Sequence, residues 1–192
     1  DRLLVGAPGH DLLLSDEGIG VVYDFVAGTW VESPPLQASS PVSFSQMGAS
    51  AALEGDVALL GAPVAASAAG AVHVFRNSGG WTETEVLTAP DASSAAFFGD
   101  AIALSGGVAV IGAPFVDKVY VFEDGPSGFE FVESFSGNAT ASGDRFGSSV
   151  ELEGDRLVIG SPERDGAFLN QGAIHVFELS LIHISEPTRQ KP

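Results

Sequence analysis

One stretch of the sequence predicts the fold most directly: Phe146-Gly147-Ser148-Ser149-Val150-Glu151-Leu152-Glu153-Gly154-Asp155-Arg156-Leu157-Val158-Ile159-Gly160-Ser161-Pro162. Apolar side chains at alternate positions from Phe146 to Leu152 predict a half-buried strand, because successive side chains of a strand point to opposite faces. Gly154-Asp155 fits a tight hairpin turn. The apolar run from Leu157 to Ile159 predicts a second strand, buried on both faces, which ends before Pro162 because proline has no amide hydrogen to donate. The stretch therefore predicts two neighbouring strands of an antiparallel sheet.

The same phrases occur along the whole chain. Gly-Ala/Ser-Pro after an apolar run occurs four times, and its prolines are 55, 51 and 48 residues apart. A phrase ending in Phe follows each copy, with Tyr23, His73, Tyr120 and His175 two residues before that Phe. A period near 50 residues indicates the blades of a β-propeller. The last three copies are each preceded by an aromatic residue or Met followed by Gly. This Gly lies thirteen residues before the Gly of the Gly-Ala/Ser-Pro that follows it: Met47-Gly48, Phe98-Gly99 and Phe146-Gly147.

Each unit reads as four strands. The third strand ends at the repeated Phe, and a fourth, more polar strand begins at Trp30, Trp81 or Phe129, as expected of an exposed edge. We therefore predict an all-β chain of four-stranded antiparallel blades at about residues 1–43, 44–95, 96–143 and 144–178. The two histidines of the third strands are predicted to share an aromatic packing position with the two tyrosines. The paired acids Glu83/Glu85 and Glu151/Glu153 are predicted to lie on solvated faces, because residues two apart share a face.

Phe146-Gly147 through Gly160-Ser161-Pro162 resembles the FG-GAP repeat, and the resemblance extends over residues 1–178. The family builds the seven-bladed propeller of integrin α subunits and of many secreted or surface proteins of bacteria. The resemblance implies a partial propeller, with about three and a half of seven blades in this chain. It also implies an extracellular or cell-surface location and a binding or adhesion role toward an unknown protein or glycan.

Calcium is the metal that the resemblance brings into question. Many FG-GAP repeats carry Asp-x-Asp/Asn-x-Asp-Gly after Gly-Ala-Pro, since alternating carboxylates converge on a cation that takes 6–8 oxygens. No loop here has that spacing. Asp11, Asp16 and Asp165 are the weak metal candidates, with solvated loop carboxylates as the favoured interpretation, and no cofactor is expected.

Composition excludes several functions. Twenty-five acids against eight bases give a net charge of −17, which disfavours phosphate-driven binding of nucleic acids and anionic membranes. No apolar run approaches the roughly 18 residues of a membrane span. The chain has no cysteine, no Gly-x-Ser-x-Gly elbow and no phosphate-binding loop, so we expect no catalysis in this segment.

The last residues depart from the repeat. Leu179 to Arg189 resembles, over eleven consecutive codons, the translation of a transposase sequencing adaptor. We expect residues 179–192 to be a non-native read-through tail on a fragment of a longer protein. The predicted function is thus a non-catalytic binding module. The alternatives are a passive spacer or display scaffold of a surface protein, and a calcium-dependent module attached to an enzyme domain elsewhere.

Overall fold

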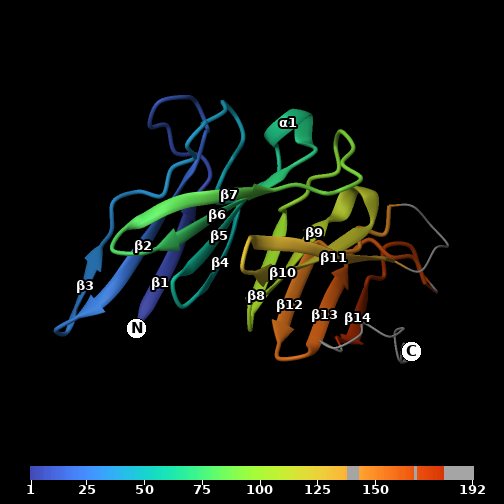
Figure 1. The fold of residues 1–192 in the computed structure, drawn as a ribbon. Helices are drawn as coiled ribbons and strands as arrows, with labels where there is room; N and C mark the ends of the chain where they lie inside the picture. Colours follow the sequence, from blue (N-terminus) through green and yellow to red (C-terminus); the bar gives the residue numbers. More distant parts are fainter. Residues whose placement is uncertain (138–142, 167, 180–192) are drawn as a thin grey trace. The chain divides into compact units, whose positions relative to one another are not determined.

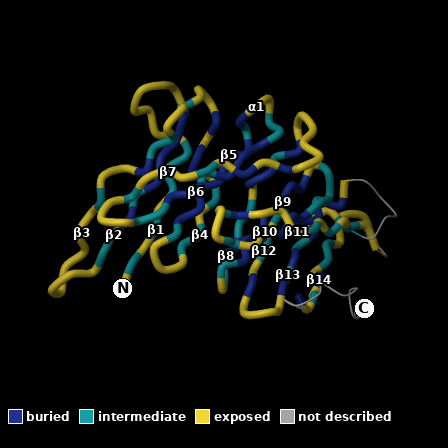
Figure 2. The backbone as a smooth tube through the Cα atoms, in the orientation of Figure 1, coloured by how far each residue is buried: buried dark blue, intermediate teal, exposed yellow. Residues whose placement is uncertain are grey.

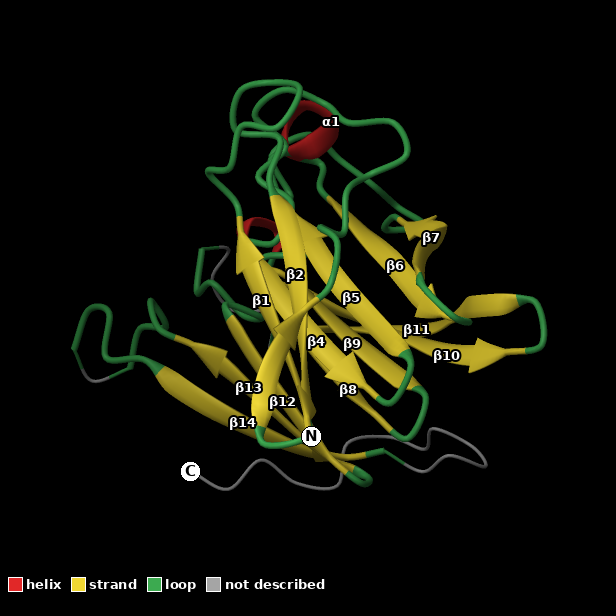
Figure 3. Cartoon of the chain, turned by 90° about the vertical axis from the view of Figure 1, so that its left-hand side faces the viewer, coloured by secondary structure: helices red, strands yellow, loops and turns green. Residues whose placement is uncertain are grey.

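The computed structural model describes residues 1–137, 143–166 and 168–179, which form four separate antiparallel sheets (Figure 1). In every sheet, strands that follow one another in the chain are hydrogen-bonded neighbours. Loops and turns connect them, including the short turns α1 (Ala65–Ala68) and η1 (Pro114–Val116) (Figure 3). The contacts divide the chain into a first unit, residues 1–100, and a second unit from residue 101 onward. Each unit holds two sheets.

The first unit contains a three-stranded and a four-stranded sheet. The three-stranded sheet is β1 (Arg2–Ala7), β2 (Ile19–Val26) and β3 (Thr29–Glu32). The four-stranded sheet is β4 (Ser50–Glu54), β5 (Val57–Ala62), β6 (Ala71–Asn77) and β7 (Trp81–Leu87). β1 lies beside β4, and apolar side chains of both sheets form one core that includes Val22, Met47, Leu60 and Phe75. β5 is buried from Ala58 to Ala62, as its apolar sequence predicts (Figure 2).

The second unit repeats this arrangement. Its four-stranded sheet is β8 (Ala101–Ser105), β9 (Val108–Ala113), β10 (Lys118–Gly125) and β11 (Gly128–Ser136). Its three-stranded sheet is β12 (Ser149–Glu153), β13 (Arg156–Ser161) and β14 (Ala173–Glu178). β12 contacts β8 and β9, and the shared core includes Val110, Val121, Phe146 and Leu157.

These sheets confirm the predicted all-β class and are consistent with partial propeller blades, and no sheet closes on itself within the described residues. The strands of each sheet fall inside one predicted blade, although the blade boundaries themselves stay predictions. The predicted tail lies outside the described residues except for Leu179. The Leu179 side chain is buried in the core of the second unit, and its N–H donates to the Asp155 carbonyl at 2.6 Å.

Strand pairing corrects the predicted alignment of the third strands. His73, Tyr120 and His175 face Leu60, Ile111 and Ile159 and share one position. Tyr23 instead pairs with Leu3, which is the register that Phe75 has with Ala58. The sequence alignment was therefore wrong by two residues in the first repeat. A shift of two keeps every side chain on the same face, so the apolar pattern carries no sign of the error.

The acids of the fourth strand are also placed differently from the prediction. The Glu83 side chain is only 7% exposed, whereas a solvated face was predicted. Glu83 Oε1 accepts from His73 Nδ1 at 2.5 Å and Oε2 accepts from the backbone N–H of Ser39 at 2.6 Å. Burial acts to raise the pKa of Glu83, but the hydrogen bonds from Ser39 and His73 outweigh it and leave the pKa below its ordinary value. Glu83 thus holds the segment between the first two sheets against the outer strand.

Candidate functional site

The candidate site consists of the loops that follow each Gly-Ala/Ser-Pro. In every sheet the loop joins the same two strands of the repeat at one end of the sheet: β1 to β2, β5 to β6, β9 to β10 and β13 to β14. We call residues 9–18, 64–70, 115–117 and 163–172 the post-proline loops. Each of the first three is contacted by the segment that leads into the next repeat, and we call residues 44–48, 95–99 and 143–147 the lead segments. Each lead segment ends in the Met-Gly or Phe-Gly phrase found in the sequence.

In the first unit the contacts between loop and lead segment are made by backbone atoms. The amides of Phe44, Gln46 and Met47 donate to the carbonyls of Ser15, Asp16 and Glu17 at 2.8, 3.0 and 3.1 Å. The second loop repeats the pattern. There the amides of Ala95, Phe97 and Phe98 donate to the carbonyls of Ser67, Ala68 and Ala69 at 3.2, 2.9 and 3.1 Å.

Close backbone approach makes glycine necessary beside these hydrogen bonds. A Cβ built on Gly61 would lie 2.1 Å from the carbonyl oxygen of Gly99, and one on Gly6 would lie 2.0 Å from that of Gly48. Neither oxygen has room to move, because each belongs to a backbone fixed by its neighbours. The Gly of Gly-Ala/Ser-Pro and the Gly of the lead segment are therefore required as a pair.

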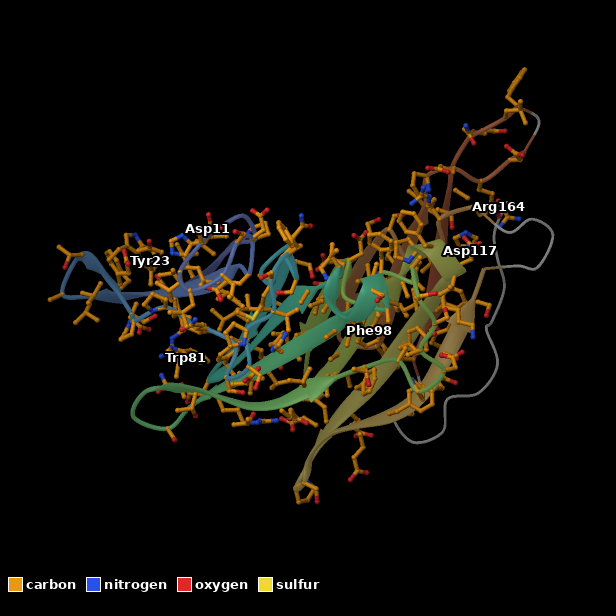
Figure 4. The ribbon with its side chains drawn as sticks, turned by 90° about the horizontal axis from the view of Figure 1, so that it is seen from above. Asp11, Tyr23, Trp81, Phe98, Asp117 and Arg164 are labelled. Atoms are coloured by element: carbon orange, nitrogen blue, oxygen red, sulfur yellow. The ribbon has the colours of Figure 1, made fainter. Side chains whose placement is uncertain are left out.

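The third loop is the shortest, and the Asp117 carboxylate accepts the amides of its lead segment where the first two loops use backbone carbonyls. Asp117 has a left-handed backbone, with φ of 53°, at the position held by Gly18, Gly70 and Gly172 in the other repeats. Its Oδ2 accepts from the Gly143 amide at 2.7 Å, and its Oδ1 accepts from the Phe146 amide at 3.1 Å. The Asp117 side chain thus replaces two backbone carbonyls as a hydrogen-bond acceptor. Figure 4 labels Asp117 where its loop ends.

The first post-proline loop, labelled by Asp11 in Figure 4, is fixed by its own acids. Asp11 Oδ1 accepts from the Asp16 amide at 2.6 Å. The buried Glu17 Oε1 accepts from the amides of Leu12 and Leu13 at 2.9 and 2.5 Å. These backbone donors, that of Leu13 first, hold the pKa of Glu17 below its ordinary value although burial opposes them. The Glu17 carboxylate is therefore an internal brace of the loop.

The fourth loop has the same frame. Asp165 Oδ1 accepts from the Asn170 amide at 2.8 Å, as Asp11 does from the amide five residues later. The Gly172 amide donates to the Arg164 carbonyl at 2.9 Å, as that of Gly18 does to His10 at 3.1 Å. Two loops with different sequences thus share these two hydrogen bonds at matching positions.

The three predicted metal candidates are divided between the two units. Asp11 and Asp16 share one loop in the first unit, and Asp165 lies in a loop of the second unit. Asp11 and Asp165 each use a carboxylate oxygen to hold their own loop. Among the described residues, no group of three or more His, Cys, Asp or Glu side chains has the geometry to hold a metal ion.

One serine and histidine pair lies below the fourth loop. Ser161 Oγ is 3.1 Å from His175 Nε2, and both residues are buried. Burial, followed by the charge of Arg164, lowers the pKa of His175, and Asp144 opposes this shift. The His175 ring also packs edge-on against Phe146, with centroids 5.1 Å apart.

Sequence reasoning missed Glu17 and Asp117. A signal for Asp117 was present, since it replaces a repeated glycine directly after the shortest loop. Glu17 gave no such signal, because a carboxylate in a polar loop resembles any solvated acid. No helix in the part of the chain that the structure describes is long and apolar enough to span a membrane.

The family model of the FG-GAP repeat matches residues 81–125 and 131–177. Each match begins in an outer strand, β7 or β11, and continues through the first three strands of the following sheet. Over residues 1–80 the repeat is carried by the phrases and sheets described above. A search of the curated proteins finds no match. The four sheets, their repeated phrases and the two family matches lead to one conclusion: the chain is an FG-GAP repeat protein.

Proposed function

We propose that this chain is a binding or adhesion module that acts outside the cell or at its surface, with no catalytic step in this segment. One observation carries the proposal: the strands and backbone contacts repeat, while the post-proline loops differ in length and side chains. Loops on a rigid scaffold are the usual place for recognition. The partner in this proposal is a protein or a glycan.

The buried serine and histidine pair fits a structural role. Ser161 is 1% exposed, so a substrate carbonyl has no path to its hydroxyl oxygen. A serine nucleophile must be reached by the substrate at hydrogen-bond distance from its base. We therefore assign Ser161 and His175 to packing.

A binding selection tests the proposal. The full chain is screened against displayed peptides and a glycan array, and binders are retested on variants with alanine at the exposed residues Asp11 and Leu14. Thr82→Ala, on an exposed position of β7, is the matched control. Binders that lose affinity for the loop variants and keep it for the control support a binding module. A chain that selects nothing above background is a spacer, and the proposal fails.

Calcium dependence is tested separately. A calcium-dependent module gains thermal stability on addition of the metal, because a ligand that binds only the folded state shifts its unfolding. We expect no change in melting temperature with calcium. A rise that Asp11→Asn removes would support the calcium-dependent alternative instead.

A further inference from the structure

Three leucines form the tip of the first post-proline loop and are exposed. The exposed fractions of Leu12, Leu13 and Leu14 are 47%, 71% and 38%. Val42 and Phe44 add two more apolar side chains, exposed at 53% and 58%. The Phe44 amide donates to the carbonyl of the residue that follows Leu14, so the two segments are adjacent. We call these five residues the leucine patch.

The leucine patch stays exposed with the next repeat already in contact. The lead segment of that repeat is docked on the loop through the amides of Gln46 and Met47, and Ser45 Oγ donates to the Glu17 carbonyl at 2.9 Å. Contact with this neighbour buries Met47 completely and leaves the leucines in solvent. A contiguous apolar patch that remains exposed marks an interaction surface.

The patch is also rigidly presented. The Glu17 carboxylate accepts hydrogen bonds from the amides of Leu12 and Leu13, and the Asp11 carboxylate accepts one from the amide of Asp16. The Gly18 amide closes the loop onto the His10 carbonyl. A loop already fixed in one conformation loses little entropy when a partner binds.

Charge around the patch selects the partner. Asp11 and Asp16 flank the leucines in the loop, and neither this loop nor the lead segment docked on it contains lysine or arginine. A surface that is apolar at its centre and negative around it complements a ligand with apolar and basic side chains.

We propose that the leucine patch is the docking site for a basic amphipathic peptide segment of a partner protein. The inference rests on the proposed binding function and names its site and partner chemistry. The leucine side chains contact the apolar side chains of the peptide. The carboxylates of Asp11 and Asp16 attract its lysine or arginine side chains. Binding requires both the apolar contacts and the attraction between opposite charges. An acidic peptide lacks the charge attraction, and a purely polar peptide lacks the apolar contacts.

The test measures binding of labelled peptides to the full chain by fluorescence anisotropy. The probes are a short peptide of alternating lysine and leucine, one of alternating lysine and serine, and one of alternating glutamate and leucine. The variant is Leu12→Ser with Leu13→Ser, and Val132→Ser, at a 43% exposed residue of β11, is the matched control. Melting temperatures confirm that each protein is folded, as expected for exposed positions.

We expect only the lysine and leucine peptide to bind, with a Kd raised about tenfold in the double serine variant and unchanged in the control. Equal binding of the lysine and serine peptide, or of the glutamate and leucine peptide, overturns the partner chemistry. Lysine and leucine binding that survives both leucine replacements overturns the site and leaves the binding function standing. Leucine-dependent binding to phosphatidylcholine vesicles in place of the peptide assigns the patch to a lipid surface and overturns the inference. A spacer is recognised independently, by its failure in the peptide and glycan selection.

Discussion

The carboxylate of Asp117 accepts the backbone N–H of Phe146 at 3.1 Å, although the two residues are 29 positions apart in the chain. Phe146 is fully buried in the core of the second unit. Asp117 therefore connects the shortest post-proline loop to the first core residue of the next repeat. In the first unit the same connection is made by carbonyls of the longer loops.

Replacement of Asp117 by alanine is expected to destabilise the second unit. The amides of Gly143 and Phe146 lose their acceptor. An unsatisfied buried donor costs about 1–3 kcal/mol, and this cost applies to the Phe146 amide because Gly143 is exposed. We expect Asp117→Asn, which keeps one acceptor and tolerates the left-handed backbone, to lose less stability. Hydrogen exchange of the Phe146 amide measures the effect, because both tryptophans lie in the first unit and do not report on the second.

Asp117→Gly separates the two contributions of this residue. It relieves the left-handed backbone and still removes the acceptor. The difference between Asp117→Gly and Asp117→Ala measures the backbone contribution. If Asp117→Ala is as stable as the wild type, the hydrogen bonds contribute nothing and the prediction is wrong.

Stability of the first unit is expected to fall in acid through Glu83. The folded-state pKa of Glu83 is lowered, so its contribution is complete above about pH 4.5 and is lost as the pH falls through the lowered value. Urea midpoints followed by tryptophan fluorescence measure this loss, since Trp81 lies in the same strand. Glu83→Gln should flatten the profile below pH 4.5, whereas Glu153→Gln, at an exposed residue of β12, should leave it unchanged. A profile that is the same in all three proteins contradicts the assignment.

The second unit has a different acid limit, set by His175. Because burial lowers the pKa of His175, its contribution is complete above about pH 6.5 and is lost as the pH falls through the lowered folded-state value. Arg164 adds to this effect and Asp144 reduces it. We expect the protection factors of the β14 amides, which correct for the slower intrinsic exchange at lower pH, to fall below pH 6.5 in the wild type.

A double variant tests whether the pair of Ser161 and His175 causes this pH dependence. Ser161→Ala alone leaves His175 without its hydroxyl partner and is expected to cost about 1–2 kcal/mol. Ser161→Ala with His175→Tyr copies the Ala113 and Tyr120 pair of the preceding repeat, and should remove the pH dependence and recover part of the loss. A loss in the double variant equal to the sum of the losses from Ser161→Ala and His175→Tyr alone would show that the two sites are independent.

Exposed apolar side chains on two sheets predict self-association. Ile174 and Val176 of β14 are 74% and 51% exposed, and Leu3 and Val5 of β1 are 51% and 49% exposed. We expect sedimentation velocity to show oligomers of the full chain at micromolar concentration. Ile174→Thr with Val176→Thr should shift the population toward monomer. A monodisperse monomer of the unaltered chain would contradict the prediction.

The apolar pattern of the sequence was sufficient for the strands, and insufficient for the contacts between polar groups. β5 and β9 are buried as their uninterrupted apolar runs predict. The segment after β3, the outer strand of the first sheet, shows the limit. Pro34 and Pro35 predict a loop, yet Leu36 returns to pair with Gly20 and is buried in the core. A single residue after two prolines carries no strand periodicity.

The candidate site was predictable in position and unpredictable in detail. The repeat spacing places the post-proline loops at one end of each sheet, because they always join the same pair of strands. The bracing carboxylates of Glu17 and Asp117 depend on which amides come within reach, and that depends on the folded backbone. Local sequence therefore does not distinguish a bracing acid from a solvated one.

In the first unit the post-proline loops accept hydrogen bonds from the lead segments through their backbone carbonyls. Any residue type supplies the same backbone carbonyl. Mutation can therefore change the outward side chains of a loop without removing its hydrogen bonds to the next repeat. The contacts between neighbouring repeats are thus separate from the side chains that form the surface of a loop. An FG-GAP repeat of this kind can change its surface by substitution in a loop, while the glycines at the close backbone contacts between repeats cannot be replaced without a steric clash.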